Sequence, residues 1–233
     1  PFDALTRGEA QSDPRAMVWV ADESDWLAYT ADGYFDASRR GGRLVAAVQG
    51  FDGFRVDQLA ARNNRPDIAL ERLGLGTPET LALYASRHQQ RLKRLGLQET
   101  DLVRNLMTAP RATLVDLTRS GRKAHLRCNF AGNGRSLRRY FAFVNDVAVG
   151  DGEGVALSGA NATVEFDIEL SAGRNKIEVS ALNDVGVESF RDVRTVNVND
   201  TAKGNLYYLG FGVSKYVDPR LTLKFAHKDV LDL

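Results

Sequence analysis

The stretch Ala124-His-Leu-Arg-Cys-Asn-Phe130 alternates apolar and polar side chains without a break. Because successive side chains of a β-strand point to opposite faces, Leu126, Cys128 and Phe130 share one face and His125 lies on the other. Similar alternating runs, separated by turns rich in Gly, Asn and Asp, cover residues 112–118, 123–130, 137–145, 163–170, 175–182 and 188–198. Short alternating strands at this spacing predict an Ig-like β-sandwich over residues 110–199.

Upstream of the sandwich, apolar residues follow a helical period. Thr77-Pro78-Glu79 combines a capping residue, a proline suited to the first helical position and an acid in the first turn, which together predict a helix start. Apolar residues recur at helical spacing up to Leu95, and Gly96 supplies the stop. Further helices are predicted over residues 56–62, 66–74 and 101–107. We therefore assign residues 51–109 to a helical region.

The first 50 residues contain the signals of a small β-hairpin sheet. Asp32-Gly33 favours a tight turn, because Gly accepts the positive φ that such turns need. Strands are predicted over residues 17–20, 26–29, 34–37 and 44–49. So small a sheet needs cover, and the helical region is the expected source.

The chain ends with an apolar run over residues 206–216, a turn at Asp218-Pro219 and the opening of a helix over residues 221–229. This order predicts the first βα element of a parallel sheet over residues 200–233. A parallel strand needs strand neighbours and helices over both faces, so the element is expected to belong to a larger protein. Within this chain it is expected to pack on the sandwich or to exchange between two copies in a swapped homodimer. The predicted fold class is α+β, multidomain and mainly β.

Motifs at this end carry a family resemblance. Gly-Val-x-x-Tyr, Asp-Pro, Leu-x-Leu and Ala-x-x-Asp, in that order, resemble the opening of the caspase-like domain in large multidomain bacterial proteins. The matching residues are Leu206 to Val213, Tyr216, Asp218, Pro219, Leu221, Leu223, Ala226 and Asp229. The family has a small residue after that Asp, whereas this chain has Val230.

Three upstream segments resemble, in order, what precedes the caspase-like domain in such proteins. Residues 26–38 resemble a segment that closes or follows a WD-repeat β-propeller. The second segment is Asp57-Gln58 followed by Asn64-Arg-Pro-Asp67, and the third is an Ig-like domain with Val144-Asn145-Asp146 and residues 173–183. The resemblance therefore touches most of the chain.

The resemblance implies a parent cysteine endopeptidase in which a His and Cys pair attacks a peptide carbonyl. Both positions would lie beyond the first βα element, so this chain should be inactive by itself. We predict a non-catalytic connector that positions a recognition module relative to a protease domain, with no catalytic, cofactor-binding or metal-binding residue and no cofactor. The alternative is a free-standing Ig-like module that binds a ligand or a protein. It would show an exposed aromatic or apolar patch on a sandwich face away from the helices.

Two residue types could carry other chemistry. Cys128 is the only thiol, but its place on the apolar face predicts an inert core cysteine rather than a nucleophile. His88 lies on the apolar stripe of its helix, without a second ligand at metal-binding spacing, so a core or interface histidine is favoured. The loop over residues 150–154 offers two carboxylates for calcium, although a solvated loop is favoured.

Aromatic and basic residues are the predicted interaction surface. Large aromatic groups on the N-terminal sheet are expected to pack on the helices or on a propeller, and one face of the segment 138–143 is expected to be a domain contact. The basic residues of the helices predict a solvated face, or else a patch for an acidic partner or nucleic acid. The residues singled out are Trp26, Tyr34, Phe35, Arg87, Arg91, Arg94, Arg139 and Phe141.

Composition narrows the remaining classes. The net charge of +1 implies no global attraction to nucleic acid or to anionic membranes, and no apolar run is long enough to span a bilayer. One cysteine makes no intramolecular disulfide, which leaves bacterial cytoplasm and periplasm both open. Protein partners, or the protein's own neighbouring domains, are favoured over nucleic acid.

Overall fold

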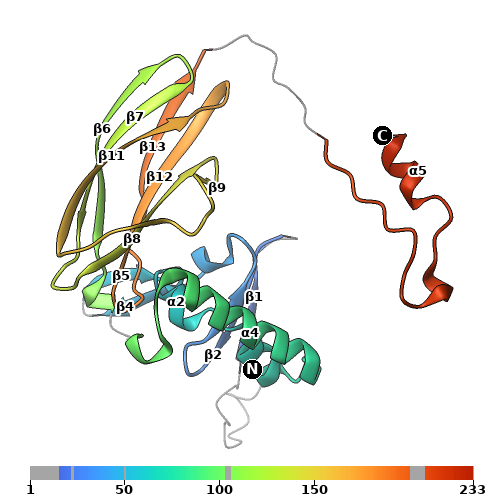
Figure 1. Cartoon of the computed structure of the whole chain (residues 1–233). Helices are drawn as coiled ribbons and strands as arrows, with labels where there is room; N and C mark the ends of the chain where they lie inside the picture. Colours follow the sequence, from blue (N-terminus) through green and yellow to red (C-terminus); the bar gives the residue numbers. More distant parts are fainter. Residues whose placement is uncertain (1–15, 22–23, 50, 103–105, 200–207, 233) are drawn as a thin grey trace, which may run out of the picture. The chain divides into compact units, whose positions relative to one another are not determined.

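The computed structural model describes residues 16–21, 24–49, 51–102, 106–199 and 208–232 (Figure 1). The chain divides into two compact units, residues 1–200 and residues 201–233. The first unit is mainly β, with several antiparallel sheets and few helices, as the sequence predicts.

Two antiparallel sheets in the first unit form a β-sandwich. One sheet has the strand order β11-β7-β6, and the other has the order β10-β8-β12-β13 with β9 paired to β8. The long strands are divided between the sheets as strands A, B, E and C, F, G are in an immunoglobulin-type sandwich. The bounds are β6 (Arg111–Ser120), β7 (Lys123–Ala131), β8 (Leu137–Val144), β9 (Val147–Ala148), β10 (Val155–Ala156), β11 (Asn161–Glu169), β12 (Gly173–Asn183) and β13 (Asp192–Val198).

The core of the sandwich lies between these sheets. Leu126, Cys128 and Phe130 of β7 are all buried in it, which confirms the face predicted from the alternation. Tyr140 of β8 stacks on Phe130 with ring centroids 5.3 Å apart, and the Phe166 ring of β11 lies 5.3 Å from Tyr140 on another side. Stacked aromatic rings of both sheets thus fill the space between them.

The N-terminal sheet is a three-stranded meander of β1 (Ala16–Val20), β2 (Trp26–Thr30) and β3 (Phe35–Ala37). A separate hairpin of β4 (Ala46–Gln49) and β5 (Asp52–Arg55) follows a 3₁₀ turn, η1 (Gly41–Arg43). The predicted strands and the Asp32-Gly33 turn are confirmed, whereas β5 was not predicted because it is short and contains a glycine.

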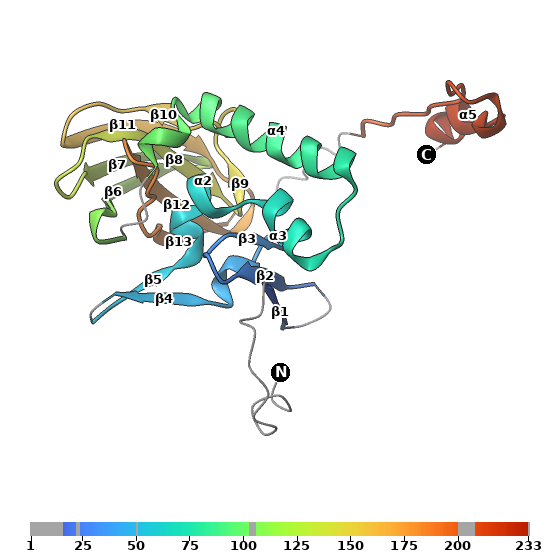
Figure 2. The ribbon, with the colours of Figure 1, turned by 90° about the horizontal axis from the view of Figure 1, so that it is seen from below.

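The helical elements that follow, up to Asp101, are η2 (Val56–Leu59), α2 (Ala60–Asn63), α3 (Pro66–Leu73), α4 (Pro78–Leu95) and η3 (Glu99–Asp101). Of these, α3 lies against the N-terminal sheet, and the long helix α4 packs on α3 (Figure 2). The Thr77 hydroxyl accepts a hydrogen bond from Thr80 N at the start of α4, and Gly96 ends it in the left-handed conformation at φ +70°. The predicted cap and stop of this helix are confirmed.

The helix predicted over residues 101–107 is wrong in the described part. The 3₁₀ turn η3 ends at Asp101, Leu102 is extended with φ −75° and ψ 126°, and a second turn, η4, covers Leu106–Thr108. The Asp101 carboxylate accepts from the backbone N–H of Gln98, which closes a short turn. The half-buried Leu102 then joins an apolar cluster with Leu92 and Leu97, so tertiary packing overrides the local helical pattern.

The last sandwich strand begins later than predicted. The strand was predicted from residue 188, but β13 starts at Asp192. The backbone N–H of Glu188 donates to Gln58 O at 2.8 Å, outside the sandwich, and that of Ser189 donates to Ala181 O at 2.8 Å. The chain therefore turns towards the helical region before it re-enters the sheet. The short strands β9 and β10 were also not predicted.

The second unit contains η5 (Pro219–Leu221) and a short helix, α5 (Ala226–Leu231). The predicted strand over residues 206–216 is wrong where the structure describes it, because residues 208–217 form no strand; residues 206–207 lie outside the described part. A strand needs a neighbour for its backbone hydrogen bonds, and the described residues of this unit offer none. Packing on the sandwich and a swapped dimer stay predictions.

None of the described helices is long and apolar enough to cross a membrane.

Candidate functional site

The C-terminal end of α4 is held by two arginines of the sandwich strand β8. Arg139 donates from Nη2 to Arg94 O at 2.6 Å and from Nε to Leu95 O at 3.3 Å, while Arg138 donates to Gly96 O. The last carbonyls of a helix lack partners within the helix and carry partial negative charge. Guanidinium donors meet both needs, so this contact joins the helical region to the sandwich.

A β-bulge brings both arginines to the helix. In the pairing of β12 with β8, Leu182 lies opposite Arg139 and Asn183 lies opposite Leu137, which leaves Arg138 as the extra residue. A bulge twists a strand and re-aims its side chains, so neighbouring residues can reach one target. Phe141 lies beyond the bulge and packs with Leu182 against the buried Leu92 of α4. Residues from both predicted faces of this segment, Arg138 as well as Arg139 and Phe141, contact the helical region within the same compact unit, and a contact with another domain stays a prediction.

Arg91 fastens α4 to the segment that follows α2. Its Nη1 donates to Asn64 Oδ1 at 2.9 Å, and its Nη2 donates to Asn64 O at 2.6 Å. The same Nη2 lies 3.0 Å from His88 Nδ1, which must accept because arginine only donates. His88 is buried, and burial, followed by the positive charges of Arg65 and Arg91, lowers its pKa to about 4. His88 is therefore a neutral core residue, as the sequence predicts.

Arg65 fastens the helices to the N-terminal sheet. Its backbone N–H donates to Phe35 O at 2.9 Å, and its guanidinium binds the Asp67 carboxylate at 2.6 Å. Burial by itself would raise the pKa of Asp67, but the hydrogen bond and charge of Arg65 hold that pKa below its usual value. The guanidinium carbons of Arg62 and Arg65 lie 5.6 Å and 6.0 Å from the Tyr34 ring centroid, within cation–π range.

A polar corner joins the start of the helices to the turn between β12 and β13. Gln58 accepts from Arg55 N at 3.0 Å and donates from Nε2 to Glu188 O at 3.0 Å. The Glu188 carboxylate accepts from the Ser180 hydroxyl at 2.6 Å. Burial raises the pKa of Glu188, with the Ser180 hydrogen bond and Arg191 acting in the opposite direction. This corner is a second contact between the helical region and the sandwich.

Two hollows lie at this corner. The first, which we call the polar cavity, has a volume of about 210 Å³ and is lined by Arg39, Arg55, Asp57, Gln58, Ala60, Glu188, Ser189, Phe190 and Arg191. The second, the apolar groove, has a volume of about 610 Å³ and is lined mainly by Phe54, Met107, Ala109, Pro110 and Phe190. Gln58 and Phe190 line both hollows, so the two adjoin.

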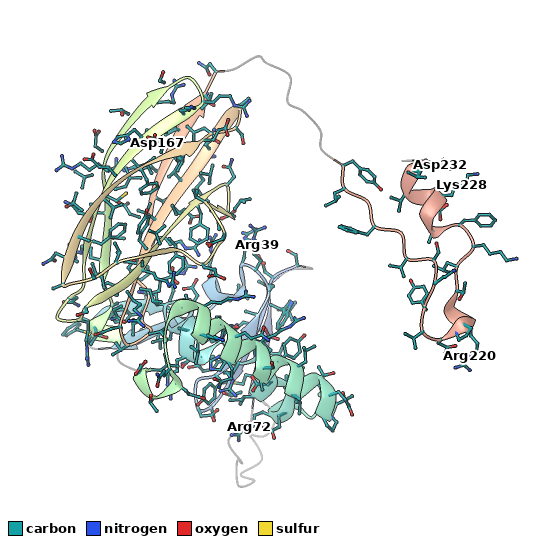
Figure 3. The ribbon with its side chains drawn as sticks, viewed as in Figure 1. Arg39, Arg72, Asp167, Arg220, Lys228 and Asp232 are labelled. Atoms are coloured by element: carbon teal, nitrogen blue, oxygen red, sulfur yellow. The ribbon has the colours of Figure 1, made fainter. Side chains whose placement is uncertain are left out.

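The residues predicted for interaction fall into two groups. The first group contacts other segments of the same unit and helps to hold that unit together; it consists of Phe35, Arg91, Arg139 and Phe141. Trp26 is 38% exposed. On the surface of α4, Arg87 lies over the Tyr84 ring at 5.9 Å, and Arg94 pairs with Glu153 at 3.6 Å. Arg72, which is labelled in Figure 3, pairs with Asp32 at 3.3 Å, so several basic residues of the helices have partners within the unit.

The residues considered for other chemistry are structural. Cys128 is buried, and burial raises the pKa of its thiol to about 11, which keeps it protonated and unreactive. His125 lies on the outer face, 2.8 Å from the Asp167 carboxylate. Among the described residues, no group of three or more His, Cys, Asp and Glu side chains is placed to hold a metal ion. The side chain of His227 lies outside the described part.

Sequence analysis missed the residues of the polar corner. Gln58 and Glu188 are 130 residues apart, and no local pattern links them. A weak signal exists in the second half of β12, where the polar residues Ser180 and Asn183 lie among Val179, Ala181 and Leu182 and are fully buried. Buried polar side chains need partners, so such interruptions indicate a contact with another segment.

No family model matches this chain, and no curated protein matches it. Among solved structures, the fibronectin(III)-like modules of Clostridium thermocellum CbhA align at 14% identity over 45% of this chain and 55% of that chain, with a TM-score of 0.34. The PKD1 domain of Vibrio anguillarum Epp aligns at 18% identity over 39% of this chain and 94% of that chain, with a TM-score of 0.27. These similarities carry no argument about function, and the sandwich assignment rests on the strand order.

Replacement of Arg139 by alanine should lower the free energy of unfolding by about 0.5–1.5 kcal/mol, because the partly exposed carbonyls at the end of α4 lose charge-assisted donors. Arg139→Lys should restore little of this, since an ammonium group cannot reproduce the planar fork that spans Arg94 O and Leu95 O. Urea unfolding measures both. The matched control is Arg119→Ala on the exposed end of β6, which should change stability by less than about 0.5 kcal/mol. Equal losses at positions 119 and 139 would contradict the role of Arg139.

The two described histidines should titrate on opposite sides of pH 6.5. The folded-state pKa of His88 is lowered to about 4. Between pH 6.5 and pH 4 the unfolded chain therefore binds more protons at this residue than the folded chain does, and the free energy of unfolding decreases as the pH falls through that window. The hydrogen bond to Asp167 raises the pKa of His125, so its contribution is complete below pH 6.5 and is lost as the pH rises through the folded-state pKa. NMR titration of the imidazole signals measures both, and a His88 midpoint at or above 6.5 would show that its site is solvated.

Proposed function

We propose that this chain is a non-catalytic connector that holds flanking modules of a larger polypeptide at a fixed separation. The observation that carries the proposal is the capping of α4 by Arg138 and Arg139 of the sandwich. Opening the contact would exchange these charge-assisted hydrogen bonds for hydrogen bonds to water and would expose the apolar contact of Phe141 with Leu92, so separation of the helices from the sandwich costs free energy. A segment built this way would keep the modules at its two ends at a constant distance and orientation.

Each interface within the first unit adds to this rigidity. The N-terminal sheet is bound to the helices through Arg65 and Asn63, whose side-chain amide donates to Gly33 O at 2.9 Å. The helices are bound to the sandwich through Arg139 at one place and Gln58 at another. Contacts at separate places resist hinge motion better than one contact does, because a hinge needs a single flexible connection.

The order of the resembling segments supports a parent protein with a caspase-like domain, in which this chain would link a propeller-type recognition module to a cysteine endopeptidase domain. In that reading the unpaired apolar residues of 208–217 would complete a strand only when the rest of the protease domain is present. The intact mass of the protein from its native source tests this parentage. A mass well above 25.7 kDa, with a catalytic His and Cys beyond Leu233, is the expected result.

The purified chain should hydrolyse no peptide. Cys128 is fully buried and protonated at neutral pH, whereas a thiolate is the attacking species in a cysteine peptidase. A fluorogenic peptide library measures the turnover. Activity that disappears in the Cys128→Ala variant would contradict the proposal, whereas activity that survives the substitution identifies a contaminant.

The distance between the helices and the sandwich should be narrowly distributed in solution. Spin labels at Leu83→Cys on α4 and Ser120→Cys on β6, in a Cys128→Ala background, report it by pulsed electron resonance; both label sites are exposed. The distribution should broaden when Arg138 and Arg139 are both replaced by alanine, because apolar packing alone leaves the helix end unsatisfied. The Arg119→Ala variant serves as the control and should stay narrow.

A broad distance distribution in the unsubstituted chain would show that the two regions move independently and would refute a rigid connector.

The alternative function, an Ig-like binding module, lacks the patch that it would need on the sheet β11-β7-β6. Charged residues pair across the outer face of that sheet: His125 of β7 contacts Asp167 at 2.8 Å, and Arg127 contacts Glu165 at 3.5 Å, both on β11 (Figure 3 labels Asp167). Such a solvated ladder of ion pairs protects an open sheet rather than offering an apolar surface. We therefore favour the connector.

A further inference from the structure

We propose that the polar cavity and the apolar groove together form a docking site for an extended peptide segment in which an acidic side chain adjoins an apolar one. The acidic side chain would enter the polar cavity, and the apolar side chain would lie in the groove. This inference goes beyond the connector function, and it stands or falls independently of how rigid the first unit is.

The charge balance of the polar cavity favours an anion. Three guanidinium groups line it, from Arg39, Arg55 and Arg191, against two carboxylates, from Asp57 and Glu188, which leaves one positive charge in excess. The Asp57 carboxylate is already paired with Arg55. Arg39 donates to a carbonyl, Asp146 O, at 2.6 Å, and its charge also helps to lower the pKa of the Asp146 carboxylate, which Lys176 binds at 2.5 Å. A carboxylate is the side-chain group that guanidinium donors bind in bidentate fashion.

An orphaned donor gives a second, independent indication. The Nε atom of Arg55 is buried and has no hydrogen-bond partner among the described residues. A buried N–H without an acceptor is costly, and native proteins rarely leave one unless a ligand or another group completes it. The Arg55 guanidinium is held at the cavity wall by its ion pair with Asp57, and the Arg55 backbone N–H donates to Gln58 Oε1 at 3.0 Å.

Arg191 is also held in place before binding. Its guanidinium carbon lies 3.9 Å from the Phe143 ring centroid, and its Nη1 lies 3.7 Å from the Glu178 carboxylate. Glu178 is itself bound more closely by Lys176, at 3.0 Å, so Arg191 shares this carboxylate rather than being neutralised by it. Pre-organised cations need little reordering when a ligand carboxylate enters, which favours binding.

The adjoining groove supplies the apolar part of the recognition. Phe190 lines both hollows, and its side chain is 48% exposed, so it forms an apolar edge beside the cationic cavity. Phe54 and Met107 extend this surface along the groove. A partner that buries an apolar side chain here and pairs its carboxylate next to it would use the hydrophobic effect for affinity and the charge for register. Neighbouring side chains of an extended peptide point in different directions, so one can enter the polar cavity while the next lies in the groove.

The test uses the full 233-residue chain and a fluorescein-labelled, C-terminally amidated hexapeptide that contains one Glu followed by one Leu. Twin peptides carry Gln in place of Glu, or Ser in place of Leu. Fluorescence anisotropy at low salt measures the dissociation constants. We expect the peptide with both Glu and Leu to bind at least about tenfold more tightly than either twin. The Gln twin loses the charge-paired contact with the polar cavity, and the Ser twin loses the burial of an apolar side chain in the groove.

Variants of the chain locate the site. Arg55→Gln and Arg39→Gln should each weaken binding of the Glu peptide at least about fivefold, whereas Arg119→Gln on the exposed end of β6 should leave it unchanged. Phe190→Ala should remove the preference for Leu over Ser, and Val193→Ala, a comparably exposed residue, should not. Circular dichroism and urea unfolding check each variant, and Arg39→Gln keeps the test valid if Arg55→Gln does not fold.

Equal affinity for the Glu and Gln peptides would overturn the proposal, as would equal losses in the position 39 and position 119 variants. Failure of the Glu peptide to bind at millimolar concentration would overturn it as well.

Discussion

The first unit depends on the end of a helix. The last carbonyls of α4 lie beside the sandwich, and the end of a helix lacks hydrogen-bond donors of its own for them. Arg138 and Arg139 supply these donors, and the bulge in β8 lets two neighbouring residues serve one target. The same strand turns Tyr140 into the sandwich core, so one segment of chain contributes to the core on one face and to the helix contact on the other.

The other contacts repeat this principle with different groups. Arg91 donates into carbonyls near the end of α2, and Gln58 uses both halves of its amide to join the helices to the turn before β13. Buried polar groups of this kind are specific because they are satisfied in one arrangement and costly in others. That specificity fits a segment whose role is to keep other modules in register. It also explains why so many of the arginines are unavailable to outside partners.

The polar corner differs from the other contacts because a cavity adjoins it. Arg55 and Arg91 each keep a buried Nε donor without a partner among the described residues, but of these two only Arg55 lines the polar cavity. A ligand group in that cavity could accept from Arg55. The exposed Phe190 beside it adds an apolar edge that the folding of the chain does not use.

Features that depend only on neighbouring residues could be predicted from the order of the amino acids. The period of two placed Cys128 in the core and His125 outside, and the cap and stop of α4 followed from Thr77 and Gly96, because strand faces and helix ends are set by local backbone geometry. Only the tertiary structure decided that Arg139 and Arg91 face inward, that Gln58 meets Glu188, and that residues 208–217 form no strand. Those outcomes depend on which distant segments supply hydrogen-bond partners, and a local pattern contains no information about partners far along the chain.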